Sequence, residues 1–186
     1  MSWNRERFEN VGYSGMLIRA AEPQDAIEVA RVHVRSWQVA YRGLLPEAYL
    51  NQLQPEDRAA RYEFASGDPL KPQTIVAVEG FVIQGFATIA PARDEDLQGY
   101  GELCALYLDP GWWSRGLGVA LITAARARLF EMGFRTACLW LLVGNTRAGR
   151  FYEMDGWKLD GLRRTAELWG VTVEEIRYLR EIAAGD

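Results

Sequence analysis

The chain has 186 residues, of which 49% are hydrophobic and 25% charged, and its net charge is −4 at pH 7. This length is most simply one domain spanning 1–186, with a core at about 16–180 and an N-terminal extension at 1–15, and the acidic balance argues against a nucleic-acid-binding protein. Because no apolar stretch approaches the ~20 residues of a membrane span and the polar start lacks a signal-peptide core, we expect a cytoplasmic protein without membrane partners.

The first predicted elements are a short strand and a long helix. The strand covers Met16 to Arg19, and Pro23 and Asp25 begin the helix. Five side chains recur along the helix at spacings of four, three, four and four, namely Ala26, Ala30, His33, Trp37 and Tyr41. This spacing places them on one face. Ile27 and Val34 add a second apolar edge, so the helix is expected to be broadly buried.

A short helix beginning at Pro55 and a β-hairpin are expected next. The short helix should contain Arg58, Arg61, Tyr62 and Phe64. The hairpin pairs strands at 74–78 and 81–89 across a tight turn at Glu79 and Gly80. The acidic residues 94–96 are typical of an exposed loop.

The middle of the chain predicts a strand–helix–strand unit. Residues 102–108 form a short apolar run, Asp109 to Gly111 stop it, and helical spacing begins at Leu117 and continues to Met132. Residues 136–143 are apolar throughout, which indicates a strand buried on both faces. The two strands of such a unit run parallel.

The last quarter of the chain predicts a short helix and two further extended segments. Asn145 and Thr146 cap the helix, Gly156 ends it, and extended structure resumes at Trp157. The last strand covers 171–179, and Arg163 with Arg164 is interpreted as a solvated loop pair. The fold class is therefore mixed α/β, antiparallel first and parallel in the middle.

The turn at 109–118 is a candidate anion site. A glycine-bearing turn between a strand and a helix presents free backbone N–H groups at a positive helix end, which suits a phosphate or pyrophosphate. It is not a P-loop, because Val119 and Ala120 supply neither the Lys nor the Ser or Thr of that motif. It is not a dinucleotide fingerprint either, because Leu121 stands where the third glycine or alanine is needed.

The same turn resembles the acetyl-CoA loop of the Gcn5-related N-acetyltransferase (GNAT) family, Arg/Gln-x-x-Gly-x-Gly/Ala. Gly116 and Gly118 match the glycines and Pro110 lies at the usual distance upstream, but Trp113 replaces the leading Arg or Gln. Residues 145–157 resemble the family's second motif, Asn-x-x-Ala-x-x-Phe-Tyr-x-x-x-Gly-Phe/Trp. The segments 37–43 and 175–178 are also similar to family members with unassigned substrates, so the resemblance covers nearly the whole chain.

The resemblance implies a mostly antiparallel central sheet, flanked by helices, whose middle pair is parallel and splays apart. The pantetheine of acetyl-CoA would fill this gap like an extra strand. The implied cofactor-binding residues are Leu106, Tyr107, Leu108, Ser114, Arg115, Gly116, Leu117, Gly118, Val119, Ala120, Asn145 and Tyr152. Asn145 has a plain alternative as a helix cap, and the two roles are compatible.

Two residues are candidates for proton transfer in an N-acetyltransferase. An alkylammonium of pKa about 10 must lose a proton before it attacks a thioester, and the resemblance implies Glu102 as the base; strand alternation would place Glu102, Cys104 and Leu106 on one face. Tyr152 would protonate the leaving thiolate of CoA. The alternatives are a solvated strand-end carboxylate and a packed tyrosine. Some relatives carry the base near Trp140, where a tryptophan cannot serve, so bulk-connected water is the other candidate.

The acceptor is expected to be a primary amine of a small molecule or peptide. His33, Trp37 and Tyr41 are candidates for lining its pocket, with core packing as the alternative. No metal site is expected, because the chain has one His and no clustered cysteines, and Cys104 and Cys138 are interpreted as free thiols rather than a disulfide or reactive pair. A homodimer is possible for this family. The alternative function is a non-catalytic acyl-CoA sensor or regulatory module.

Overall fold

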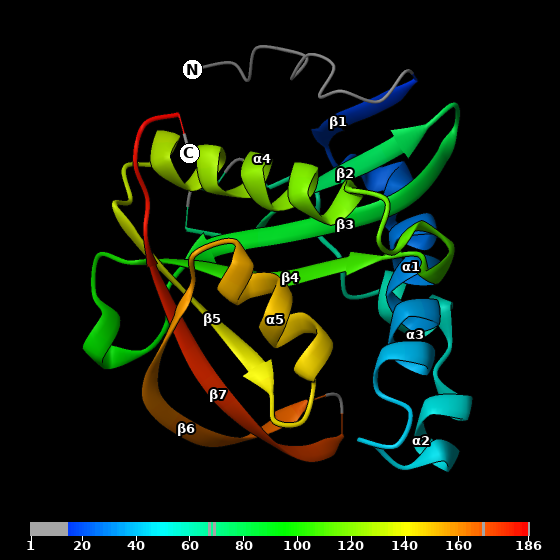
Figure 1. The fold of residues 1–186 in the computed structure, drawn as a ribbon. Helices are drawn as coiled ribbons and strands as arrows, with labels where there is room; N and C mark the ends of the chain where they lie inside the picture. Colours follow the sequence, from blue (N-terminus) through cyan, green and yellow to red (C-terminus); the bar gives the residue numbers. More distant parts are fainter. Residues whose placement is uncertain (1–14, 67, 69, 169, 186) are drawn as a thin grey trace.

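The computed structural model describes residues 15–66, 68, 70–168 and 170–185. The expected N-terminal extension, 1–15, lies outside them except for Gly15. Within the described residues the chain forms one seven-stranded sheet with the order β1-β2-β3-β4-β5-β7-β6 (Figure 1). The strands are β1 Met16–Ala20, β2 Gln73–Glu79, β3 Val82–Pro91, β4 Gly101–Leu108, β5 Thr136–Leu142, β6 Lys158–Leu168 and β7 Val171–Glu181.

Helices pack on both faces of this sheet. On one face lie α4 and α5 (Figure 1), and they contribute Leu121 and Tyr152 to the largest buried cluster. On the other face α1 contributes Val29, Val32 and Trp37 to two further clusters. The α-helices are α1 Ala26–Ala40, α2 Glu47–Gln52, α3 Pro55–Ala59, α4 Leu117–Glu131 and α5 Thr146–Met154, with short 3-10 turns at Pro23–Asp25, Glu95–Leu97 and Pro110–Trp112.

The parallel pair β4–β5 is held together only at its beginning. All other neighbouring strands are antiparallel, whereas β4 and β5 are parallel and share only the register pairs Gly101–Ala137 and Glu102–Cys138. Beyond Glu102, β4 continues to pair with β3 and has no register partner in β5. The predicted fold class, with a splayed parallel pair in the middle of a mostly antiparallel sheet, is therefore confirmed.

A β-bulge at Cys104 reverses the side-chain alternation of β4. Thr88 pairs with Ala105 and Ile89 with Leu103, which leaves Cys104 as the extra residue. As a result, Leu103, Leu106 and Leu108 all pack toward α4, whereas Ala105 and Tyr107 pack toward α1. The prediction that Glu102, Cys104 and Leu106 share one face was wrong for Leu106, because a bulge adds a residue and shifts the pleat by one.

Other differences from the sequence prediction lie in short or polar segments. The helix that begins at Pro55 ends at Ala59, so Tyr62 and Phe64 follow it in loop structure, and α2 was not predicted. Arg163 and Arg164 lie within β6, not in a loop, and Arg164 is half-buried in ion pairs. Asp94 was expected in an exposed loop but is also half-buried, because Trp140 and Arg164 bind its carboxylate.

Both cysteines are free thiols. Burial raises the pKa of Cys104 and raises that of Cys138 to about 12, so neither is a thiolate at neutral pH. Within the described residues, no helix is long and apolar enough to cross a membrane, and no group of three or more His, Cys, Asp or Glu side chains is placed to hold a metal ion.

Candidate active site

A cavity of about 650 Å³ opens where β4 and β5 separate. Residues of α1, β4, β5, α5 and the turn before α4 line it. Of the predicted cofactor-binding residues, those in the lining are Leu106, Tyr107, Leu108, Ser114, Gly116, Gly118, Val119, Asn145 and Tyr152. Leu117 and Ala120 are instead buried on the core side of α4. Arg115 is exposed, and its guanidinium lies 5.4 Å from the centre of the Trp112 ring. The structure thus brings most of this set together.

The turn before α4 is fixed by side chains at its base. Asp109 accepts a hydrogen bond from the Gly111 N–H at 3.0 Å, and the Trp113 indole N–H donates to the Leu108 carbonyl at 3.2 Å. Ser114 and Gly116 have φ values of 60° and 83°, a left-handed conformation that glycine tolerates and serine adopts only under constraint. Gly116 is the N-cap of α4, so the unpaired N–H groups of the first turn begin at the cavity.

Gly118 is required for two reasons. It lines the cavity, where a side chain would fill space beside the helix end. A Cβ there would also lie 3.3 Å from Cε2 of Phe151, closer than an ordinary contact. The second reason was not apparent from the sequence, and it means that Gly118 also sets the packing of α5 on α4.

Asn145 caps α5, as predicted. Its side-chain oxygen accepts a hydrogen bond from the Ala148 N–H at 3.2 Å, which satisfies one of the unpaired donors at the helix start. Asn145 also lines the cavity. The plain alternative is therefore observed, and a second role for its amide group toward a ligand remains compatible with it.

Tyr152 lies at the wall of the cavity on α5. Its side chain is 8% exposed and packs against the rings of Phe151, Trp157 and Tyr178, with centroids 5.3, 6.2 and 6.4 Å away. Within the described part of the chain its hydroxyl has no hydrogen-bond partner. Burial raises the pKa of Tyr152 above its ordinary value, so the phenol is a stable proton donor at neutral pH.

The end of the cavity near α1 is aromatic. The hydroxyls of Tyr41 and Tyr107 lie 3.2 Å apart, and both residues line the cavity. The pKa of Tyr41 is raised well above its ordinary value, mainly by burial and to a smaller extent by the neighbouring Tyr107. The sequence does not predict this contact of the Tyr107 side chain, because no local signal indicates which face of β4 it occupies.

His33 and Trp37 lie behind this aromatic end and outside the cavity lining. The His33 ring stacks on Tyr107 at 4.6 Å, and its Nδ1 lies 2.6 Å from the Tyr62 hydroxyl. Burial, assisted by the charge of Arg58, lowers the pKa of His33 to about 3. His33 is therefore neutral at physiological pH, and it supports Tyr107 from behind.

Glu102 lies at the start of β4 and is 5% exposed. Its carboxylate pairs with Arg93, whose Nη2 is 3.3 Å from Oε1. Glu102 is not in the cavity lining, whereas Cys104, two residues further along the same strand, is. A proton that moves between the cavity and this carboxylate would therefore have to travel past Cys104.

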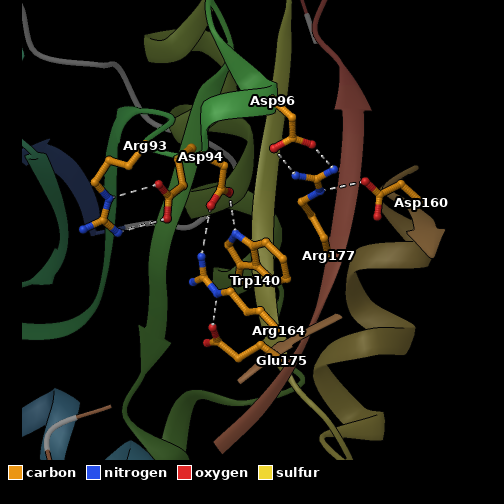
Figure 2. Close-up of polar contacts among 9 residues, drawn as sticks. Arg93, Asp94, Asp96, Trp140, Asp160, Arg164, Glu175 and Arg177 are labelled. Carbon is orange, nitrogen blue, oxygen red and sulfur yellow. Dashed lines mark hydrogen bonds and ion pairs between the residues drawn. The ribbon is translucent and has the colours of Figure 1, made fainter. Parts of the chain in front are cut away.

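Trp140 forms another part of the cavity wall and is held by a network of charged residues (Figure 2). Its indole N–H donates to Asp94 at 2.8 Å, and the Arg164 guanidinium lies 3.9 Å from its ring. Arg164 in turn binds Asp94 and the buried Glu175. Beside them Arg177 binds both Asp96 and Asp160 (Figure 2). This network fixes the orientation of the tryptophan.

The charge at the cavity is positive. Among the described residues, the ionised side chains that line it are Arg147 and Arg150, both on α5. The nearby carboxylates Glu102, Asp94 and Glu175 lie outside the lining, and each is paired with an arginine. The cavity therefore suits a ligand with an anionic part near α5 and a neutral part between the strands.

Solved structures share this fold. The chain superposes on the PaiA N-acetyltransferase of Thermoplasma acidophilum, determined with coenzyme A, with a TM-score of 0.67 and 19% identity over 90% of this chain and 99% of that one. The yncA protein of Salmonella typhimurium, determined with acetyl-CoA, gives a TM-score of 0.66 and 17% identity over 92% and 96% of the two chains. The fold is that of the N-acetyltransferases.

Sequence comparison identifies the family. A profile described as "Acetyltransferase (GNAT) family" matches residues 34–157. The uncharacterized N-acetyltransferase YuaI of Bacillus subtilis is 33% identical over 129 residues, which cover 69% of this chain and 72% of that protein. An N-acetyltransferase of Mycobacterium bovis is 29% identical over 75% of this chain and 86% of that protein. The chain therefore belongs to the GNAT acetyltransferase family.

Proposed function

We propose that this protein transfers the acetyl group of acetyl-CoA to a primary amine by direct attack in a ternary complex. The observation that carries the proposal is the continuous cavity, which extends from the turn before α4 to the aromatic end at Tyr41 and has Tyr152 in its wall. One end is suited to phosphates and the other to an organic acceptor. Coenzyme A and acetyl-CoA in the two solved relatives support this choice of acyl donor.

The gap between β4 and β5 would hold the pantetheine arm. Because β5 departs after Glu102, backbone groups of Leu106, Tyr107 and Leu108 on that edge of β4 lack a strand partner. Amide groups of a pantetheine chain would supply one, in the manner of an added strand. An N–H on this edge would also donate to the thioester oxygen as negative charge develops on it.

Tyr152 would act as the acid in our proposal. When the amine nitrogen attacks the thioester carbon, the carbon–sulfur bond breaks and the electron pair remains on sulfur. The Tyr152 hydroxyl has no other partner among the described residues, and its raised pKa keeps it protonated, so it is available to donate to that sulfur. The proton that the attacking nitrogen loses as the amide forms then restores the phenol. The transition state gains more from this donation than the ground state does, because sulfur carries more charge there.

Glu102 would act as the base through water. The ammonium form of the acceptor has to lose a proton before attack, and Glu102 is the carboxylate at the start of the splayed pair. Because Glu102 is outside the lining, the proton would pass through water beside Cys104 to reach it. Arg93, which pairs with the Glu102 carboxylate, has 76% of its side chain exposed, so the proton that Glu102 accepts would pass to solvent at this end of β4.

A turnover assay with acetyl-CoA and a mixed panel of amines tests the proposal. Free thiol release together with mass spectrometry of the acetylated product should reveal transfer, and varying both substrates should give the intersecting lines of a ternary complex. Parallel lines would contradict direct attack. Tight CoA binding with no transfer to any amine in the panel would favour the alternative of a non-catalytic acyl-CoA sensor.

A further inference from the structure

Arg147 lines the cavity beside the turn that precedes α4. It lies in the first turn of α5, lines the cavity and is exposed. Its guanidinium is 4.1 Å from the centre of the Trp113 ring, and its Nη2 donates to the Ser114 hydroxyl at 3.3 Å. A side chain of α5 therefore reaches across to the turn before α4 and lies directly on it.

The turn itself lacks a cation pointed at the cavity. Trp113 stands at the position where the family motif has Arg or Gln, and its indole N–H is already used by the Leu108 carbonyl. Arg115, the basic residue of the turn, is outside the lining and lies over Trp112. The described residues give Arg147 no carboxylate partner, so none of them neutralises its charge.

The location of Arg147 is unfavourable for the helix that carries it. A cation in the first turn of a helix lies at the positive end of the helix dipole and destabilises it slightly. The α4 helix also begins at this place, which adds a second positive helix end. Arg147 therefore contributes little to folding where it stands, and an anion is the partner that this arrangement lacks.

We infer that Arg147 binds the pyrophosphate of the acyl-CoA and supplies from α5 the positive charge that the turn lacks. This inference rests on the proposed function, since it presumes that CoA occupies the cavity. The stacking on Trp113 and the hydrogen bond to Ser114 hold the guanidinium beside the first N–H groups of α4. A phosphate there accepts hydrogen bonds from the guanidinium fork and the backbone together.

Calorimetry on the full chain with three ligands tests this inference. The ligands are CoA, 3′-dephospho-CoA, which keeps the pyrophosphate, and pantetheine, which has no phosphate. Arg147→Gln should weaken CoA and 3′-dephospho-CoA by the same factor, about 10- to 100-fold as expected for a charged hydrogen bond, and should leave the weak, millimolar binding of pantetheine unchanged. Arg147→Lys, which keeps the charge without the fork, should fall between Gln and the wild type.

Arg163→Gln is the matched control, because Arg163 is an exposed arginine of β6 outside the cavity lining. It should bind all three ligands as the wild type does. Arg147→Gln and Arg163→Gln should both keep the melting temperature of the wild type, since both arginines are exposed and Arg147 is at an unfavourable helix position. Unchanged CoA affinity in Arg147→Gln, or a loss for CoA without one for 3′-dephospho-CoA, would overturn the inference. A wild type that binds none of the ligands would instead refute the proposed function.

Discussion

Replacing Tyr152 by Phe separates acid catalysis from packing. The substitution keeps the ring and its contacts with Phe151, Trp157 and Tyr178 and deletes only the hydroxyl. If the hydroxyl donates to the leaving sulfur, kcat should fall by about 10²-fold, the lower end of the range for general acids, which corresponds to about 2.7 kcal/mol. The KM for acetyl-CoA should change little, because the interaction strengthens only in the transition state.

The structure also predicts what this substitution does to stability. When a buried tyrosine whose hydroxyl makes a core hydrogen bond is changed to Phe, the free energy of unfolding falls by about 1 kcal/mol. Within the described residues the Tyr152 hydroxyl has no such bond to lose, so the free energy of unfolding should change by less than about 1 kcal/mol. A large loss of activity with little loss of stability is the combination expected of a catalytic hydroxyl.

The assay is a single-turnover measurement with saturating amine, because product release could otherwise mask the chemical step. Tyr178→Phe is the matched control: Tyr178 packs against Tyr152, its hydroxyl donates to Glu153 at 3.3 Å, and it is outside the cavity lining. It should retain the wild-type rate. An unchanged single-turnover rate in Tyr152→Phe, or an equal loss in both variants, would refute the assignment of Tyr152 as the acid.

Three further substitutions test other parts of the site. Glu102→Gln should lower kcat by roughly 10²–10⁴ at pH 7, with the loss narrowing at high pH where the amine arrives deprotonated; a pH profile that parallels the wild type would dismiss the base. Gly118→Val should abolish CoA binding and also lower the melting temperature, because its side chain meets Phe151; calorimetric affinity within threefold of the wild type would contradict this. Burial lowers the pKa of His33 to about 3 in the folded state, below its unfolded value of about 6.5. The unfolded state therefore binds the proton first, and the free energy of unfolding should fall as the pH drops from about 6.5 toward about 3. The fall should be at most about 1.4 kcal/mol per pH unit. Chemical denaturation of His33→Phe should show a shallower pH dependence, and an equal slope would show that other groups cause it.

The sequence predicted the central strand–helix–strand unit well because its signals are local. An apolar run, a glycine-bearing turn and a helical period follow one another from 102 to 132, and each is readable within a few residues. The cap at Asn145 and the glycine that ends α5 are local as well. The resemblance to the family rests on the same segments, which explains why fold and cofactor-binding region were predicted together.

What the sequence could not show depends on contacts between distant segments. The bulge at Cys104 involves no glycine or proline, so nothing in β4 marks it, yet it decides the face on which Leu106 lies. The Arg164 side chain is half-buried because Asp94 reaches it across 70 positions of sequence. The sequence predicts the beginning of β6 at Trp157 but indicates a loop at Arg163 and Arg164, because most side chains of this strand are polar and exposed. Periodicity describes one segment at a time and cannot report such pairings.

Two tryptophans of the site are accommodated in the same way. Trp113 replaces the leading Arg or Gln of the family motif, and Trp140 lies where some relatives are expected to carry the base. The indole N–H of Trp113 donates to Leu108 and that of Trp140 donates to Asp94. An arginine lies on each ring, Arg147 on Trp113 and Arg164 on Trp140. In each case other residues accept the hydrogen bond of the indole N–H and cover one face of the ring, which holds the tryptophan in a fixed orientation.

This shared arrangement has different consequences at the two tryptophans. At Trp113 the covering Arg147 lines the cavity, so we expect it to supply from α5 the positive charge that the turn lacks. At Trp140 the covering Arg164 lies outside the cavity lining and is ion-paired with Asp94 and Glu175. It therefore presents no free charge to the cavity. In our proposal, phosphate binding therefore relies on Arg147, whereas deprotonation of the amine relies on Glu102 and water. A variant that restores a carboxylate, Trp140→Glu, should then reduce the dependence of kcat on Glu102; if Glu102→Gln costs as much in that background as in the wild type, the division of roles is wrong.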